Sequence, residues 1–312
     1  MYRLKVLLKQ ILYLFKLLGK KTRLKRKLEK LLHKLDSNIV AIDVGASYFP
    51  HTKWGLVKRL PSTLWIAIDP NEQNLSYIDK WRYPSKAIKI AKAVGYKNGK
   101  SKFYLTKVDS GSSLLNIEIN KNSSHRVVKE NLLPIIEKEI EVNTLDKITG
   151  KFLEKKSSII IKLDTQGSEF NIVKSFFKNH FFRNVLLIEL ENNILASPIY
   201  KGSSETYEIL KFFNDNDFEV VNLNVVSSVY PRSNRWLKSV NVPSECDWVF
   251  MKKFSSILDK DLETKFNAIK TYLSYNLYGE ALHLIKHILG NDKISNQYKE
   301  KLIRIKKILM PL

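Results

Sequence analysis

Short apolar runs alternate with stretches of helical periodicity from about residue 37 to residue 254. This alternation is typical of a parallel α/β sheet, in which helices join buried strands. The pattern predicts seven main strands, at Ile39–Val44, Leu64–Ile68, Ala87–Ala93, Ile159–Leu163, Val185–Leu190, Phe218–Asn222 and Asp247–Lys252. Shorter runs at Lys102–Leu105 and Ile140–Val142 predict added strands. The polar segment between them, residues 107–139, is interpreted as a lid or substrate-facing insertion.

Helical periodicity also marks both ends of the chain. Apolar residues recur at helical spacing from Leu4 to Leu18 and, after Gly19, from Leu24 to Leu35, with lysines on the opposite face. The chain becomes helical again beyond Phe254. Three parts are therefore predicted: a basic amphipathic helical arm at 1–36, an α/β domain at 37–254 and a C-terminal helical appendage at 255–312.

The positive charge is concentrated in the arm. The whole chain carries a net charge of +22, and residues 1–36 hold 12 Lys/Arg against 2 Asp/Glu, a net +10. Such an arm can lie on an anionic membrane surface through its basic face. It can equally pack its leucine stripe on the domain or on a second subunit, so a homo-oligomer stays open. Nucleic acid is less favoured as a partner because the leucine stripe is so continuous.

Cysteine content and hydropathy indicate the cellular compartment in which the protein is expected. The single cysteine, Cys246, excludes a disulfide framework and a thiolate metal cluster, and no metal site is predicted. The chain has no run of eighteen uncharged apolar residues, so no membrane-spanning helix is expected. Lysines interrupt the first apolar stripe, which argues against a signal peptide. We therefore expect a cytoplasmic protein that is peripheral at the inner face of the membrane if the arm binds lipid.

Acidic residues stand at the ends of the first two predicted strands. Asp43 is followed two residues later by Gly45, and such a turn lets backbone approach a ligand while the carboxylate accepts hydrogen bonds from its hydroxyls. Asp69 ends the second strand and is placed to bind ribose hydroxyls. Many buried strands end in acid-x-glycine, and Asp69-Pro70 is also a common turn, so structural roles remain open for both.

The fourth predicted strand runs into the richest polar cluster, Asp164-Thr165-Gln166-Gly167-Ser168-Glu169. Ligands of open α/β folds bind at this edge of the sheet. Asp164 could take a proton from an acceptor hydroxyl or orient it. Glu169 could face the substrate, or it could serve the first turn of the next helix, where an acid is favoured by the helix dipole.

Two further residues are candidates for proton transfer. Glu189 lies within an apolar run, where a carboxylate needs a partner or a functional reason. His51 is a candidate base, although a lone loop histidine is more often a surface or structural residue. The catalytic candidates are therefore Asp164, His51 and Glu189.

Five motifs occur in a fixed order along the chain. They are Asp43-Val44-Gly45-Ala46, Ala91-Lys92-Ala93-Val94 with Asn98-Gly99, Ser112-Ser113-Leu114, Val142-Asn143-Thr144-Leu145-Asp146, and Ile161-Lys162-Leu163-Asp164-Thr165-Gln166-Gly167-Ser168-Glu169. Together they resemble the FkbM family of S-adenosylmethionine-dependent methyltransferases over residues 38–253. The resemblance implies a seven-stranded, mostly parallel, Rossmann-like methyltransferase sheet whose last strand runs antiparallel between its neighbours.

The resemblance also implies roles for individual residues. Asp43, Gly45 and Ala46 would frame the methionine end of the cofactor, and Asp69 with Pro70 the ribose. Ala93 and Val94 would lie by the adenine, with Asp164 and Gln166 near the transferred methyl group. Ser112, Ser113 and Glu169 would face the substrate. The family usually has another glycine after its first motif, where this chain has Ser47-Tyr48-Phe49-Pro50; the turn is therefore expected to differ in shape, with Ser47, Tyr48 or His51 contributing.

By the same resemblance, the expected reaction is O-methylation of a hydroxyl-bearing small molecule or glycan, with S-adenosylmethionine as cofactor. A nicotinamide-dependent oxidoreductase is disfavoured because no G-x-G-x-x-G follows the first strand. A base-amino methyltransferase is disfavoured because Asp164-Thr165-Gln166-Gly167 stands where such enzymes carry Asn/Asp-Pro-Pro-aromatic. A non-catalytic module that binds a nucleoside or an anionic partner remains the alternative.

Overall fold

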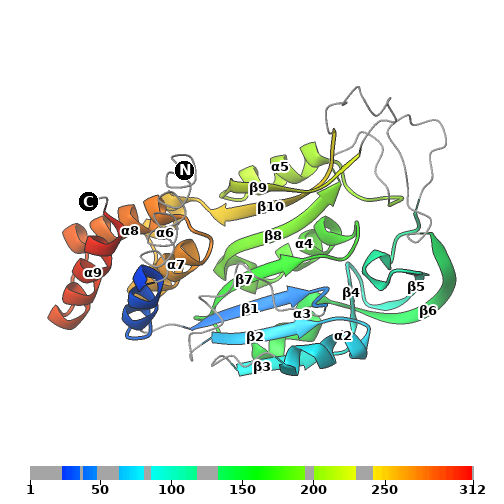
Figure 1. Cartoon of the computed structure of the whole chain (residues 1–312), viewed down its shortest axis with the longest axis horizontal. Helices are drawn as coiled ribbons and strands as arrows, with labels where there is room; N and C mark the ends of the chain where they lie inside the picture. Colours follow the sequence, from blue (N-terminus) through cyan, green and yellow to red (C-terminus); the bar gives the residue numbers. More distant parts are fainter. Residues whose placement is uncertain are drawn as a thin grey trace, which may run out of the picture.

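The computed structural model describes residues 23–35, 38–47, 63–80, 86–117, 133–193, 200–229 and 242–310. A seven-stranded sheet in the order β3-β2-β1-β7-β8-β10-β9 forms its centre (Figure 1). These strands are β1 (Ile39–Val44), β2 (Thr63–Ile68), β3 (Lys86–Ile90), β7 (Ser158–Leu163), β8 (Val185–Asn193), β9 (Phe218–Val229) and β10 (Val242–Lys252). The sheet is parallel except for β10, which runs antiparallel to both of its neighbours. The predicted fold is confirmed.

Both faces of the sheet are buried. Successive side chains of a strand point to opposite faces, so β1 sends Ile39 and Ala41 into one hydrophobic cluster and Val40 and Ile42 into the other. This explains why the central strands are continuous apolar runs, as is usual for a parallel sheet covered on both sides. The polar side chains at their carboxyl ends are therefore exceptions to the pattern.

Helices cover the two faces in separate groups. One group packs with the Val40 cluster and comprises α3 (Leu145–Thr149), α4 (Glu169–Phe177) and α5 (Thr206–Asp215). The other packs with the Ile39 cluster and comprises α2 (Glu72–Ser76), α6 (Phe254–Leu258), α7 (Leu262–Ser274), α8 (Tyr278–Asn291) and α9 (Asn296–Leu309). Short 3-10 turns are η3 (Tyr77–Lys80), η4 (Asp109–Gly111), η6 (Gly150–Phe152) and η7 (His180–Asn184). Within these described residues, no helix combines the length and apolarity needed to cross a membrane.

A second, three-stranded sheet stands beyond the carboxyl ends of the parallel strands (Figure 1). Its order is β4-β6-β5, with β4 at Ala93–Gly95, β5 at Gly99–Thr106 and β6 at Pro134–Thr144. The predicted strand Ala87–Ala93 is therefore wrong as one unit, because the chain turns at residues 91–92 and passes from the first sheet into the second. The predicted insertion at 107–139 is also corrected, since residues 134–139 belong to β6; its central part, 118–132, lies outside the described residues.

The described part of the basic arm packs on the C-terminal helices. Residues 23–32 are helical, and Leu28, Leu32 and Leu35 are buried in the cluster that contains α7, α8 and α9. The buried Lys270 ammonium donates a hydrogen bond of 2.8 Å to the Leu35 carbonyl oxygen. For this segment, the leucine stripe thus packs on the protein itself; residues 1–22 lie outside the described residues.

Truncating Leu32 should show that this helix is part of the cooperative core. Leu32 is 0% exposed, so Leu32→Ala is expected to lower the free energy of unfolding by about 2–5 kcal/mol through lost burial and a residual cavity. Urea denaturation followed by circular dichroism measures the change. The exposed Lys30→Ala on the same helix is the control, expected within about 0.5 kcal/mol of the parent; equal unfolding midpoints for both variants would contradict the packing role.

Candidate active site at the carboxyl ends of the parallel strands

Three adjacent parallel strands end at one cavity of about 600 Å³. Gly45 and Ser47 follow β1, Asp69 follows β2 and Asp164 follows β7, and all four line the cavity. Because β2, β1 and β7 are neighbours in the sheet and run in the same direction, their carboxyl ends share one edge. Asp43, near the end of β1, and Asp69, directly after β2, therefore stand at the same edge of the sheet.

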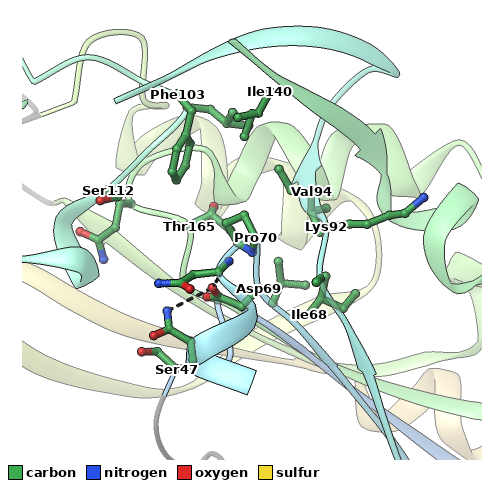
Figure 2. Close-up of a pocket in the computed structure, with 18 of the residues that line it drawn as sticks. Ser47, Ile68, Asp69, Pro70, Lys92, Val94, Phe103, Ser112, Ile140 and Thr165 are labelled. Carbon is green, nitrogen blue, oxygen red and sulfur yellow. Dashed lines mark hydrogen bonds between the residues drawn. The ribbon is translucent and has the colours of Figure 1, made fainter. Parts of the chain in front are cut away.

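The Asp69 carboxylate is held in a polar network. Its Oδ1 accepts hydrogen bonds from the Asn71 backbone N–H at 2.8 Å and from Asn74 Nδ2 at 3.1 Å. Asn74 Nδ2 also donates to Asp109 Oδ2 at 2.7 Å. Figure 2 shows Asp69 in the lower part of the cavity, near Ser47. Burial raises the pKa of Asp69 to about 6, so the group is mostly ionised at neutral pH and can accept hydrogen bonds from ligand hydroxyls.

The opposite wall of the cavity is largely apolar and comes from the second sheet. Ala93 and Val94 of β4, Phe103 of β5 and Ile140 of β6 line it. In Figure 2, Phe103 and Ile140 lie across the cavity from Asp69. A hydroxyl-binding end and an apolar wall match the two parts of a nucleoside, a sugar and a flat base. The predicted lining roles of Pro70, Ala93 and Val94 fit this arrangement.

Gly45 permits the close packing of β1 against the turn after β7. Its φ is +77°, and a Cβ atom there would come 1.9 Å from the Asp164 carbonyl oxygen. An L side chain is excluded both by the backbone angle and by this contact. The glycine therefore keeps the two strand ends close enough to share one cavity.

The turn after β7 is tight and is stabilised by hydrogen bonds to the Glu169 carboxylate. Gln166 has φ +59° and Gly167 has φ +103°. The Glu169 carboxylate accepts hydrogen bonds from the Thr165 N–H at 2.7 Å and from the Gly167 N–H at 2.9 Å. Glu169 is buried and is not a lining residue. The structure thus places this predicted substrate residue behind the turn, where it shapes the backbone at the start of α4.

Asp164 is paired on both oxygens. Lys162 Nζ lies 2.9 Å from Oδ2, and Gln166 Nε2 donates to Oδ1 at 2.9 Å. Burial opposes the charge, but the Lys162 ammonium and these hydrogen bonds hold the pKa of Asp164 below its usual range. A third of the Asp164 side chain, 33%, remains exposed, so the carboxylate reaches the cavity while its orientation is constrained.

The Gln166 side chain is oriented by partners that sequence analysis missed. Tyr200 O–H donates to Gln166 Oε1 at 2.6 Å, and Gln166 Nε2 lies 3.4 Å from Glu191 Oε2. Tyr200 also packs on Gly167, where an added Cβ would meet the Tyr200 Cβ at 2.7 Å. The sequence does not mark Glu191 or Tyr200 as partners of Gln166. Glu191 resembles the polar end of any strand, and Tyr200 follows in a loop.

Asp43 and Glu189 flank Lys162 across the sheet rather than lining the cavity. Asp43 of β1 is in register with Lys162 of β7, and Lys162 is in register with Glu189 of β8. Glu189 is 1% exposed and accepts a hydrogen bond of 2.8 Å from the Tyr275 hydroxyl at the end of α7. The structure gives this predicted catalytic residue a buried partner away from the cavity, which is a correction.

The remaining predicted residues divide in a similar way. Ser112 lines the cavity, whereas Ser113 Oγ lies behind it and donates to the Gln166 carbonyl oxygen at 2.7 Å. Ala46 is buried in the core, and its N–H donates to the Ile68 carbonyl oxygen at 3.1 Å. Tyr48 and His51 lie outside the described residues.

Comparison with known proteins identifies the family. The model of the methyltransferase FkbM domain matches residues 43–220. No curated protein sequence matches the chain significantly.

Several solved structures match the chain, with low identity and low TM-scores. A precorrin-6y C5,15-methyltransferase from Geobacter metallireducens is 12% identical, with 73% of this chain and 88% of that chain covered and a TM-score of 0.30. An S-adenosylmethionine-dependent methyltransferase from Anabaena variabilis is 9% identical, with 70% and 79% covered and a TM-score of 0.31. These likenesses carry no argument about function, and the assignment depends on the domain match. The chain belongs to the FkbM-domain family of S-adenosylmethionine-dependent methyltransferases.

Proposed function

We propose that this chain transfers the methyl group of S-adenosylmethionine to a hydroxyl oxygen of a sugar, glycan or related metabolite. The observation that carries the proposal is Asp164, a carboxylate oriented by Lys162 and Gln166 at the wall of the cavity. Such a group can hold an acceptor hydroxyl in position and take its proton.

The residues present fit the cofactor. Ser47 Oγ is inaccessible to solvent and has no hydrogen-bond partner in the described part of the chain, although Ser47 lines the cavity. A buried hydroxyl of this kind is satisfied when a polar ligand group meets it. Asp69 would hold the ribose hydroxyls, and the Val94 and Phe103 side chains would contact the base. When bound, S-adenosylmethionine supplies a methyl carbon on a positively charged sulfur, which departs as a neutral thioether.

Substitution of Asp69 tests the cofactor site directly. Calorimetry should show binding of S-adenosylmethionine and S-adenosylhomocysteine but not of NAD. Asp69→Asn should weaken both by about 10- to 100-fold, because a hydrogen bond to a charged acceptor contributes about 1.5–3 kcal/mol. Affinity of the parent for S-adenosylhomocysteine should also fall as the pH drops through about 6, where Asp69 becomes protonated, and the variant should lose this dependence.

The exposed Glu208→Gln on α5 is the matched control and should bind like the parent. If Asp69→Asn binds S-adenosylmethionine as tightly as the parent, Asp69 does not contact the cofactor. Binding of NAD alone would contradict the methyltransferase proposal and favour an oxidoreductase.

The class of acceptor is tested with a labelled methyl group. Incubation with methyl-tritiated S-adenosylmethionine and a panel of monosaccharides and nucleotide sugars should place label in an acid-stable methyl ether. Asp164→Asn should lower the rate by about 10²- to 10⁴-fold, the usual contribution of a positioned proton acceptor, while Glu208→Gln should not. Label recovered in added RNA in place of sugar would overturn the acceptor class, and no transfer to any acceptor would favour the non-catalytic binding module.

For the basic arm, we propose contact with an anionic membrane surface. The exposed residues of the described segment 23–35 are all basic: Arg23, Lys25, Arg26, Lys27, Lys30, His33 and Lys34. Leu28, Leu32 and Leu35 of the same segment are buried in the core, so the side of the segment that faces solvent is basic. Basic residues near an anionic bilayer contribute about 1 kcal/mol each.

Charge substitution, rather than deletion, tests the membrane proposal, because removing residues 1–36 would also remove buried leucines. The triple variant Lys25→Gln, Arg26→Gln, Lys30→Gln should bind phosphatidylserine vesicles about 10²-fold more weakly in a flotation assay. The exposed triple variant Lys151→Gln, Lys155→Gln, Lys156→Gln makes the same charge change elsewhere and should bind like the parent. Equal binding of the two variants to the vesicles would contradict a role of the arm in membrane binding.

A further inference from the structure

Two carboxyl groups meet beside the cavity. Asp164 follows β7, and Glu191 lies in the neighbouring strand β8. Gln166 Nε2 is shared between them, at 2.9 Å from Asp164 Oδ1 and 3.4 Å from Glu191 Oε2. Two carboxyl groups that share one amide nitrogen lie close together, and burial and mutual repulsion disfavour two negative charges there. The pair therefore keeps one proton.

The groups around the pair decide where this proton resides. Lys162 from β7 contacts only the Asp164 side, at 2.9 Å. Glu191 faces the charges of Asp164, of Glu245 on β10 and of Glu169 on α4, and burial together with these charges raises the pKa of Glu191 to about 10. Asp43 on β1 acts on the Lys162 side, and the Tyr200 hydroxyl donates to Gln166. The proton therefore belongs to Glu191, and Asp164 carries the negative charge.

We infer that Asp164 and Glu191 work as one carboxyl pair, which releases its proton to solvent when the cationic cofactor binds and recovers a proton from the acceptor hydroxyl. This inference rests on the proposed function and deepens it. Asp164 lines the cavity and is the catalytic residue. Glu191 acts through Asp164 and is a positioning residue.

The charges balance at each stage. In the free protein, the Lys162 ammonium offsets the single negative charge of the pair. With the cofactor bound, two positive charges, on Lys162 and on sulfur, offset two carboxylates. In the transfer, the acceptor O–H bond breaks toward Asp164, the oxygen electron pair forms the bond to the methyl carbon, and the sulfur–carbon electron pair remains on sulfur. The pair is then singly protonated again, and the neutral thioether leaves a site with no uncompensated charge.

A consequence is that the pair distinguishes the cofactor from its product. S-adenosylmethionine carries the sulfonium charge and S-adenosylhomocysteine does not, so only the first should displace the proton. By linkage, release of one proton makes affinity rise by up to about tenfold per pH unit while Glu191 is protonated in the free protein. Above about pH 7, where Asp69 is already ionised, the affinity for the product should lack this rise.

Calorimetry in two buffers of different ionisation enthalpy counts the protons released on binding. At about pH 8.5, Glu169, with a pKa near 7, is already ionised and does not contribute. The parent should release about one proton more with S-adenosylmethionine than with S-adenosylhomocysteine. Glu191→Gln keeps a donor toward Asp164 but has no proton to lose, so the difference should vanish while cofactor binding persists. Glu208→Gln should match the parent.

An equal proton count in the parent and in Glu191→Gln would overturn the carboxyl pair while leaving the proposed function in place. Failure of the parent to bind S-adenosylmethionine at all would overturn the proposed function and the pair together. Infrared difference spectra of the parent protein give a readout that needs no variant. The band of a protonated carboxyl group should be lost on adding S-adenosylmethionine and kept on adding S-adenosylhomocysteine; a band that persists in both would contradict the inference.

Discussion

The largely buried Lys162 ammonium is the charge on which the site depends. It stands near the carboxyl end of β7, in register with Asp43 and Glu189 on the neighbouring strands and 2.9 Å from Asp164. Burial alone would favour a neutral amine, but the surrounding carboxylates, Asp164 first and Asp43 next, raise the pKa of Lys162. A single cation thus allows several acidic groups to gather at the edge of an apolar sheet without prohibitive repulsion.

This arrangement explains how a basic protein keeps an acidic site. The chain has a net charge of +22, and among the described residues the segment 23–35 exposes a basic surface. At the cavity the sign is reversed by Asp69, Asp109 and Asp164. Hydroxyl groups and a sulfonium are recognised by carboxylates, so the local charge suits the cofactor.

The helices at the two ends of the chain stabilise the same face of the sheet. Asn267 of α7 donates a hydrogen bond of 3.0 Å to Ser158 Oγ at the start of β7, and Lys270 binds the carbonyl of Leu35. These contacts lie at the amino ends of the strands, opposite the cavity. The scaffold and the chemistry therefore occupy opposite edges of one sheet, and variation at one edge need not disturb the other.

The sequence by itself determined the sheet, the family and the strand ends that carry Asp69, Asp164 and Gln166. These are local properties, since apolar runs and the residues that follow them are contiguous in the chain. Only the tertiary structure decided that Glu189 accepts a hydrogen bond from Tyr275 and that Glu169 stabilises the turn after β7. It also decided that Glu191 and Tyr200 lie within hydrogen-bond distance of the Gln166 side chain. It also decided that Leu32 packs on the C-terminal helices. Such contacts join residues far apart in the chain, and a pattern along one segment cannot specify which distant segment will face it.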